Sequence, residues 1–400
     1  MLSVDEARAK ILGALKVTPP ETIALANAYG RVTAVPVLAR LTQPPSDISA
    51  MDGYAIRAVD AEAGAVLKVI GSAPAGHPFN GQVGAGEAVR LFTGSVIPRG
   101  ADTVIIQENV TASGSTIHLT EAAGIMKNIR AAGQDFAVGD VLVPAGKLVN
   151  ARDIGLAAAG NHPWVTVHQR PRIAILATGD EISLPGEAIS DGGIVSSNAH
   201  MLAAFIMACG GEPVVLPIAG DNIAAIVEGA DAARGADMLV TTGGASVGDH
   251  DLVQPALQAR GLTLDFWKIA MRPGKPLMFG NLGTMPMLGL PGNPVSAYVC
   301  ALLFLRPAIT ELSGLPAEAP VLETARLDSA MKPNDQREDY VRANLRRDGY
   351  EWVVTPFGKQ DSGMLRTLAN AEALIKRPPH DPGKKIGDIV EIIRLGAMGL

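Results

Sequence analysis

Four acidic residues each follow a segment that we predict to be a strand: Glu181, Asp221, Asp249 and Asp251. In an open α/β sheet, ligands bind beyond the carboxyl ends of the strands, so these side chains should converge at one edge. Mg²⁺ prefers one or two carboxylates together with waters and ligand phosphates. The acids therefore predict a magnesium site, with helix N-capping as the alternative role of Asp221 and Asp251.

A glycine-rich loop follows one of these strands, with the sequence Thr241-Thr-Gly-Gly-Ala-Ser-Val-Gly-Asp-His-Asp251. Glycines allow backbone N–H groups to approach an anion closely, and the N-terminus of a following helix favours negative charge. We interpret the loop as a phosphate-binding segment. A simple tight turn is the alternative.

Two cations lie on one rigid turn in the segment Lys268-Ile-Ala-Met-Arg-Pro-Gly-Lys-Pro276. The Pro and Gly residues should direct Arg272 and Lys275 the same way, which suits an oxyanion, although such turns are often merely solvated. Arg342 and Ser362 could add a guanidinium and a hydroxyl if the C-terminal segment packs over the sheet.

Polar residues interrupt the β-rich first part of the chain at Ser49–Ala55, Phe92–Ser95, Gln107–Glu108, Asn128–Arg130 and Asp135. Buried polar groups without partners are costly. These clusters therefore indicate either a satisfied network or a site that faces another surface, and structural turns are the alternative.

The elements that must position these residues change character along the chain. A capping box formed by Ser3 and Glu6 begins a helix that should end near Lys16. Short β-prone runs separated by turns at Gly71, Gly76, Gly81 and Gly94 predict an all-β module from about residue 41 to 148. Asn150 should then cap a helix through Ala159 that Gly160 ends at the C′ position, and a strand is expected over Trp164–His168.

Continuous apolar runs alternate with helical segments from Arg172 to about Gly314, which predicts an open α/β sheet. Strands are expected at 173–177, 214–218, 238–242, 264–269, 277–279 and 287–290, and helices at 197–209, 222–234, 252–260 and after Asn293. Asp348-Gly349 lies between two β-prone runs and predicts a hairpin in a small C-terminal β domain.

Composition limits the possible functions. The chain has 400 residues, which predicts two to four domains, and a net charge of −6 without blocks of like charge, which argues against nucleic-acid binding. The two cysteines form no disulfide framework or metal knuckle, and no paired histidine spacing indicates zinc. The apolar run Val295–Leu305 is too short to span a bilayer and the N-terminus lacks a signal segment, so we expect a cytoplasmic protein without membrane contact.

The motifs resemble those of the molybdopterin molybdenumtransferases, the MoeA-like proteins whose eukaryotic counterparts include the gephyrin E domain. The resemblance runs in order over nearly the whole chain. It rests on Ser49–Ala55, Phe92–Gly94, Gly100–Thr103, Gln107–Glu108, Asn128–Arg130, Thr178–Glu181, Gly243–Asp249, Pro273–Pro276 and Leu290–Ala297. It implies insertion of molybdate into adenylylated molybdopterin, with release of AMP in a Mg²⁺-dependent step.

The resemblance also implies roles for single residues. It implies catalytic roles for Asp52, Thr93, Asp135, Glu181, Asp221 and Asp251, of which Glu181, Asp221 and Asp251 would lie near the metal. It implies substrate contacts for Gly243, Gly244, Ser246, Gly248, Lys268, Arg272, Lys275, Pro276, Asn293, Arg342 and Ser362. Among these, the glycine loop would bind the pterin phosphate or pyrophosphate, and Arg272, Lys275, Arg342 and Ser362 would surround molybdate.

The family fold implies four domains: a linking domain at 1–42 and 139–168, an inserted β domain at 43–138, a doubly wound α/β molybdopterin-binding domain at 169–314 and a C-terminal β-barrel at 318–400. It also implies a homodimer in which Asp52, Thr93 and Asp135 reach the other subunit's site, and a handover of substrate from a molybdopterin adenylyltransferase.

Two positions depart from the family pattern: Arg272 stands where many relatives have Lys, and Ser196 stands where an acid is common. Arg272 leaves the choice between molybdate and tungstate open. Adenylylation of molybdopterin is the competing enzymatic interpretation, because the α/β domain alone resembles adenylyltransferases. A cofactor-binding scaffold is the non-enzymatic alternative.

Overall fold

Two compact units make up the chain in the computed structural model, which describes residues 1–244, 252–317 and 319–396. The first unit comprises Met1–Glu21, Gly30–Ala34 and Val167–Leu400, and the second comprises Thr22–Tyr29 and Val35–Thr166. Strands β1 (Pro20–Ala24) and β12 (Trp164–His168) lie at the boundaries between them. The four expected domain boundaries stay a prediction.

A six-stranded sheet forms the centre of the first unit, in the order β16-β13-β17-β21-β20-β18. The strands are β13 (Arg172–Ala177), β16 (Glu212–Val215), β17 (Met238–Thr242), β18 (Leu262–Trp267), β20 (Met278–Leu282) and β21 (Met285–Leu290). The first four in this order are parallel, and β20 and β18 are antiparallel to their neighbours. Ile173 and Ile175 pack into one core and Ala174 and Leu176 into another, so both faces of β13 are buried.

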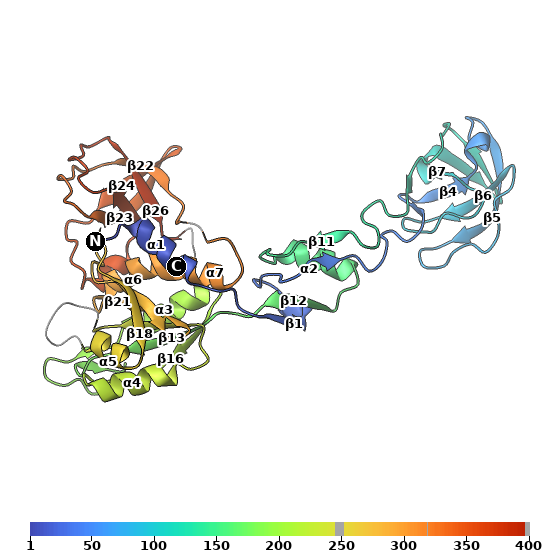
Figure 1. The fold of residues 1–400 in the computed structure, drawn as a ribbon. Helices are drawn as coiled ribbons and strands as arrows, with labels where there is room; N and C mark the ends of the chain where they lie inside the picture. The colour runs from blue at the N-terminus through green and yellow to red at the C-terminus, as the bar shows by residue number, and fades with distance from the viewer. Residues whose placement is uncertain (245–251, 318, 397–400) are drawn as a thin grey trace. The chain divides into compact units, whose positions relative to one another are not determined.

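Helices cover both faces of this sheet (Figure 1). One core contains residues of α1 (Val4–Gly13), α3 (Asn198–Ala208), α6 (Pro294–Cys300) and α7 (Arg306–Leu312), with a π-helical turn at Ala301–Leu305 (η4) between the last two. The other contains residues of α4 (Ile223–Ala232) and α5 (Val253–Ala259). The expected doubly wound α/β domain is confirmed.

The helical run Pro294–Leu312 is long and apolar enough to cross a membrane by length and composition alone. It continues past the apolar segment Val295–Leu305 that the sequence singles out. Of its most apolar window, 83 % is buried inside the protein. Its apolar character is accounted for by its place in the core of the α/β domain.

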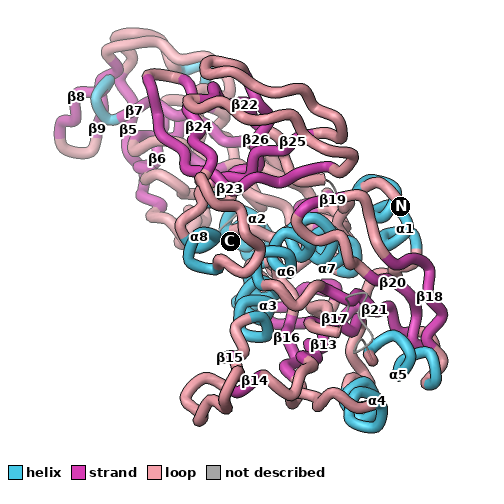
Figure 2. The backbone as a smooth tube through the Cα atoms, turned by 90° about the vertical axis from the view of Figure 1, so that its left-hand side faces the viewer, coloured by secondary structure: helices cyan, strands magenta, loops and turns pink. Residues whose placement is uncertain are grey.

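Five strands of the C-terminal segment close into a barrel. They are β22 (Glu323–Leu327), β23 (Glu338–Asp348), β24 (Glu351–Pro356), β25 (Ala373–Arg377) and β26 (Ile389–Arg394). The order β23-β24-β22-β26-β25 returns to β23 through a β23–β25 pairing (Figure 2), which confirms the expected barrel. Short strand β19 (Met271–Arg272) adds in parallel to β23, and helix α8 (Leu365–Ala369) follows β24 in the chain.

The second unit contains another six-stranded sheet, in the order β7-β4-β6-β5-β9-β8. Its strands are β4 (Gly53–Ile56), β5 (Val66–Ala73), β6 (Glu87–Leu91), β7 (Thr103–Ile106), β8 (Val110–Ser113) and β9 (Thr116–Leu119). The unit also contains two short strand pairs, β3 (Ile48–Ser49) with β10 (Ile129–Arg130) and β2 (Val37–Leu38) with β11 (Val141–Val143), and helix α2 (Ala151–Ala159), which contacts β11. Turns η1 (Leu25–Asn27), η2 (Ala58–Asp60) and η3 (Gln107–Asn109) are 3₁₀-helical. The expected β module is confirmed.

Several local expectations need correction. Helix α1 ends at Gly13 rather than near Lys16. Gly71 lies inside β5 at a register shift, not in a turn. Gly160 is the C-cap of α2 with φ −76°, and the left-handed residue is Asn161. A glycine is still needed at position 160, because a Cβ atom there would stand 2.2 Å from Cδ1 of Leu142.

Candidate active site

A cavity of about 740 Å³ lies at the carboxyl ends of the parallel strands in the first unit. The segments that follow β13, β17 and β21 all line it, through Thr178, Gly179 and Glu181 in the first, Gly243–Gly244 in the second and Pro291–Asn293 in the third. These strands are neighbours and parallel, so their loops open on the same edge of the sheet. The cavity therefore lies where the α/β topology predicts a ligand site.

Two of the three predicted metal-binding acids, Glu181 and Asp221, line this cavity. Asp221 is not a helix cap, because Asn222 caps α4 by accepting a hydrogen bond from the backbone of Ala225. Instead, Asp180 and Asp221 hold each other: each carboxylate accepts a hydrogen bond from the other residue's backbone N–H, at 2.9 and 3.3 Å. This reciprocal pair joins the two loops, after β13 and after β16, that carry Glu181 and Asp221.

The donor set on the cavity wall fits Mg²⁺. Two carboxylates are what this ion uses when waters and ligand phosphates complete its shell. Within residues 1–244, 252–317 and 319–396, no three His, Cys, Asp or Glu side chains gather as a complete protein-made metal site. Any ion held by Glu181 and Asp221 therefore needs further ligands from outside the described residues.

Gly243 and Gly244 are required where the loop after β17 begins. Both have positive φ, +96° and +59°. A Cβ atom on Gly243 would stand 2.6 Å from the carbonyl oxygen of Thr178, and one on Gly244 would stand 2.3 Å from Cγ2 of Val253. The two glycines let this backbone lie against β13 and α5, where it forms part of the cavity wall. Ser246, Gly248, Asp249 and Asp251 lie outside the described residues.

Asn198 and Thr178 also line the cavity, and the sequence argument did not assign them a role. The Asn198 amide donates to Oγ1 of Thr242 at 2.9 Å and to the carbonyl oxygen of Gly292 at 2.7 Å, which joins α3 to two of the site loops. Its Oδ1 atom, like Oγ1 of Thr178, is buried without a hydrogen-bond partner in the part of the chain that the structure describes. The sequence did hold a signal for each residue: Thr178 directly follows a predicted strand, and Asn198 lies at the start of a predicted helix.

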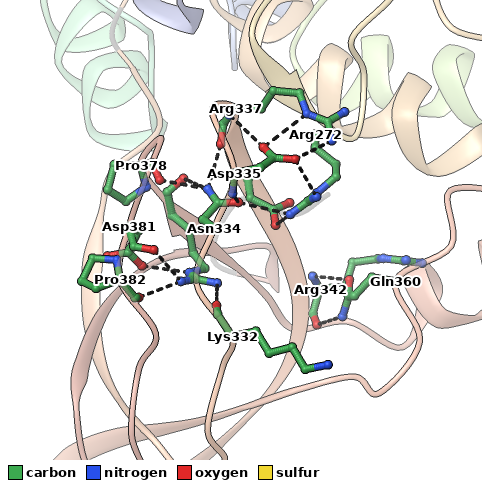
Figure 3. A network of polar contacts seen from close by, with 12 residues as sticks. Arg272, Lys332, Asn334, Asp335, Arg337, Arg342, Gln360, Pro378, Asp381 and Pro382 are labelled. Carbon is green, nitrogen blue, oxygen red and sulfur yellow. Dashed lines mark hydrogen bonds and ion pairs between the residues drawn. The ribbon is translucent and has the colours of Figure 1, made fainter.

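Arg272 forms ion pairs with carboxylates of the C-terminal barrel segment. Its guanidinium forms ion pairs with Asp335 at 3.2 Å and with Asp339, and donates to Oδ1 of Asn334 at 3.1 Å (Figure 3). The hydrogen bond that Arg272 donates to the Asp339 carboxylate is the main cause of the raised pKa of Arg272. Three of its five N–H groups are thus used, and the remaining two have no partner among the described residues.

Arg342 is buried, with 1 % of its surface exposed. Its guanidinium donates to the carbonyl oxygens of Asp361, at 2.8 Å, and Met364, at 3.3 Å. Its backbone forms two hydrogen bonds with the Gln360 side chain, well separated from the Arg272 cluster in Figure 3. Burial lowers the pKa of Arg342. The residue therefore holds the segment that carries Ser362.

A second cavity of about 610 Å³ is lined by Arg272, Arg342 and Gln360. In the sequence, Ser362 lies between Gln360, which lines the second cavity, and Gly363, which lines the first. The hydroxyl of Ser362 accepts a hydrogen bond from the Asn293 amide at 3.0 Å. Lys332 is an exposed cation on the wall of the second cavity that the sequence argument missed, because a lone Lys gives no pattern.

The remaining cations of the predicted turn lie apart. Lys275 is exposed and forms no ion pair with the described residues, and its neighbour Pro276 lines the first cavity. Lys268 lines neither cavity and has its ammonium 4.2 Å from the centre of the Trp267 ring. Its φ of +75° is unusual for a residue with a side chain.

Asp52 and Thr93 form a pair in the second unit. Oδ1 of Asp52 accepts hydrogen bonds from the backbone N–H and the hydroxyl of Thr93, at 2.8 and 2.9 Å. These bonds lower the pKa of Asp52. Asp135 makes no contact with this pair among the described residues and lines a separate, shallow cavity with Phe136 and Leu156.

Comparisons with known proteins cover nearly the whole chain. Three family models match in order: the MoeA N-terminal region (domain I and II) over residues 2–160, a probable molybdopterin binding domain over 174–311, and the MoeA C-terminal region (domain IV) over 324–395.

Relatives named molybdopterin molybdenumtransferase match end to end. The one from Haemophilus influenzae is 36 % identical over 98 % of this chain and 98 % of its own length, and the one from a Nostoc species is 35 % identical over 94 % and 88 %. Two solved structures of the molybdopterin biosynthesis MoeA protein from Pyrococcus horikoshii have TM-scores of 0.85 and 0.82, at 27 % identity, and cover 98 % of this chain and 99 % of theirs.

Proposed function

The chain belongs to the molybdopterin molybdenumtransferase family, and from that membership we propose that it inserts molybdate into adenylylated molybdopterin with release of AMP. As a member of this family it is a transferase of molybdenum cofactor biosynthesis. The adenylylated form of the substrate, AMP as product and Mg²⁺ dependence are the proposed parts.

The observation that carries the proposal is the cavity at the carboxyl ends of β13, β17 and β21. Two carboxylates, Glu181 and Asp221, and the glycine backbone at Gly243–Gly244 line the same space. A phosphoanhydride ligand needs both a cation and close backbone approach, and these groups supply the sites for them.

The reaction balances without a redox partner. Water cleaves the phosphoanhydride and AMP leaves, while both dithiolene sulfurs bind molybdenum. One oxide of molybdate leaves as water with the two thiol protons, so molybdenum keeps its oxidation state. Mg²⁺, when bound, neutralises the charge that develops on the phosphates.

The chain's own residues hold the reactants. Glu181 and Asp221 would bind the ion, and the reciprocal Asp180–Asp221 hydrogen bonds hold their two loops together. Lys275, with the unused N–H groups of Arg272 and the Ser362 hydroxyl, orients the oxyanion. Arg342 acts on this group through the carbonyl oxygens of Asp361 and Met364. Asp251, Ser246 and Gly248 are proposed in the same site.

Three further parts of the proposal concern the setting of the reaction. A homodimer would let Asp52, Thr93 and Asp135 serve the site of another copy, and a molybdopterin adenylyltransferase would supply the adenylylated substrate. A cytoplasmic location suits both.

The direct test replaces Glu181 by Gln and Asp221 by Asn and measures AMP release against Mg²⁺ concentration. Each variant should need much more Mg²⁺ and release AMP at least about tenfold more slowly, because one carboxylate ligand is lost. Glu212→Gln is the matched control, since Glu212 is an exposed acid at the start of β16, 3.6 Å from Arg172 and at the end of the sheet opposite the cavity. Undiminished AMP release in both site variants would refute the assignment of these acids.

A further inference from the structure

Arg90 lies on the sheet of the second unit between two aromatic rings. Its guanidinium carbon is 4.9 Å from the centre of the Tyr54 ring and 5.2 Å from that of Phe92. Tyr54 is its cross-strand partner in the β4–β6 pairing. Both rings therefore hold the guanidinium by cation–π contact.

The same guanidinium donates two hydrogen bonds in different directions. One N–H donates to Oε1 of Gln107 at 2.6 Å, and another donates to the carbonyl oxygen of Gly53 at 3.3 Å. Gln107 in turn donates its backbone N–H to the carbonyl oxygen of Asp52 at 3.1 Å. Arg90 thus contacts three separate segments of the chain.

Each of these segments adjoins the Asp52–Thr93 pair. Gly53 follows Asp52, Phe92 precedes Thr93, and the backbone of Gln107 is bonded to Asp52. Gly53 has no room to shift, because a Cβ atom there would stand 2.0 Å from the carbonyl oxygen of Ile105. Strand pairing fixes the backbone at Gly53, and Arg90 fixes the adjoining segments at Phe92 and Gln107.

The two oxygens of the Asp52 carboxylate differ in their hydrogen bonds. Oδ1 accepts both hydrogen bonds from Thr93, and Oδ2 has no hydrogen-bond partner in the described ranges. The Thr93 backbone bond, then the Thr93 hydroxyl, and then the charge of Arg90 lower the pKa of Asp52, so it stays ionised at neutral pH. Glu108, bonded to the Gln107 amide at 3.3 Å, and the Tyr54 hydroxyl are the other titratable groups of this cluster.

We propose that Arg90 is a positioning residue that holds the Asp52–Thr93 pair in the geometry required for molybdenum transfer. This rests on the proposed function, in which Asp52 and Thr93 take part. A planar guanidinium stacks on two rings and donates in two directions at once, which an ammonium group does not do. The proposal therefore concerns the guanidinium and not the charge alone.

The first test needs no substrate. In the full-length protein with ¹³C-labelled aspartate, the Asp52 carboxyl signal is assigned by its loss in Asp52→Asn and is titrated. Its pKa should rise toward the ordinary value in Arg90→Met, because both the charge and the loop contacts are lost. Arg57→Met is the control, since Arg57 lies in the same unit and forms a half-buried ion pair with Asp60 at 3.5 Å, and it should leave the titration unchanged.

The second test uses Arg90→Lys, which keeps the charge and conserves the fold. Its transfer rate, kcat, should fall roughly tenfold or more while KM for molybdate changes less than about twofold, because misplacement of a reacting group reduces the rate more than binding. An unreduced molybdenum transfer rate in Arg90→Lys, or an unchanged Asp52 titration in Arg90→Met, would overturn the role of Arg90 and leave the proposed function standing. Full transfer by Asp52→Asn would instead overturn the proposed role of Asp52, and with it the need for positioning.

Discussion

The ion pairs of the C-terminal segment include both buried and exposed ones. Arg377 and Asp381 are both about 5 % exposed and bond to each other at 2.9 Å, with backbone carbonyl oxygens taking the other guanidinium donors. Asp335, in contrast, is exposed and bridges Arg272 and Arg337 (Figure 3). The buried pair is a fixed part of the barrel, whereas the bridge at Asp335 responds to pH.

The pH response of Asp335 follows from its partners. Hydrogen bonds from the side chain and backbone of Arg337 lower its pKa from 3.8 to about 2. A lowered pKa means that these contacts contribute fully above the unfolded value and are lost as pH falls through the folded value. Titration of the Asp335 carboxyl by ¹³C NMR should give a midpoint near 2 in the native protein and a higher one in Arg337→Gln. A midpoint near 4 in the unaltered protein would contradict the ion-pair geometry.

The two cysteines should be unreactive in the native protein. Burial raises the pKa of Cys209 to about 11 and raises that of Cys300 further still. The thiolate is the nucleophile, so little of it is present at pH 8. Iodoacetamide should modify neither residue until the chain is unfolded, as mass spectrometry can measure. Rapid alkylation of native Cys209 would show that α3 opens far more than its packing allows.

At the scale of residues, the sequence predicted which side chains would belong to the site and which loops would carry them. It did not predict the ion-pair and hydrogen-bond partners of each charged side chain. Glu181 and Asp221 were named from their places after strands and Asn293 from the family resemblance, and all three line one cavity. Arg272 and Arg342 were predicted to face an oxyanion together. Their actual partners, Asp339 and the carbonyl of Asp361, depend on how the barrel strands pair, and no local pattern encodes that.

At the scale of elements, the turn Pro273–Pro276 connects the α/β sheet to the barrel. It follows β19, which pairs with β23, and its Gly274 lies directly over Cys300 of α6. The sequence predicted the bend from Pro and Gly. It could not predict β19, because this two-residue segment is a strand only through its pairing with residues 67 positions away, as Met271 pairs with Glu338.

Gly274→Ala tests this packing. Gly274 has φ +108°, and a Cβ atom would stand 2.5 Å from Sγ of Cys300. We expect a loss of roughly 2–4 kcal/mol in unfolding free energy by urea titration, from backbone strain plus the clash. Gly283→Ala is the control, because φ is +63° with nothing within 4 Å, so strain alone should cost about 1–2 kcal/mol.

Equal losses in the two variants would mean that the contact with Cys300 does not constrain the turn. The double variant Gly274→Ala, Cys300→Ala should recover part of the loss, because the clashing sulfur is removed.

Elements with strong local signals matched their expectations closely. Strands β12 and β17 have the expected bounds, and α1 and α2 both begin with the expected caps. Their boundaries follow from apolar runs and capping side chains a few residues apart. The π-helical turn Ala301–Leu305 had no such signal, since every residue in it is apolar and buried.

At the scale of the whole molecule, the two units have separate cores. The large core of the first unit includes Ile175, Leu288 and Phe304, and the cores of the second include Ile105 and Ile117 in one cluster and Val89 and Leu91 in another. Multi-domain chains commonly depart from two-state unfolding. Each unit should therefore unfold with its own stability.

Calorimetry should resolve more than one unfolding transition. Ile117→Ala, at a fully buried position of the second unit, should lower one transition, with a loss of about 2–5 kcal/mol. Gly274→Ala should lower the other. A single transition that both variants shift alike would show that the units unfold as one cooperative body.

The central claim is that this chain couples AMP release to molybdenum insertion. The most direct measurement mixes the purified protein with adenylylated molybdopterin, Mg²⁺ and molybdate, and quantifies AMP and dithiolene-bound molybdenum over time. Both products should appear together in equal amounts, and omission of molybdate or Mg²⁺ should abolish both. Consumption of ATP with unmodified molybdopterin, or insertion of molybdenum without AMP release, would contradict it.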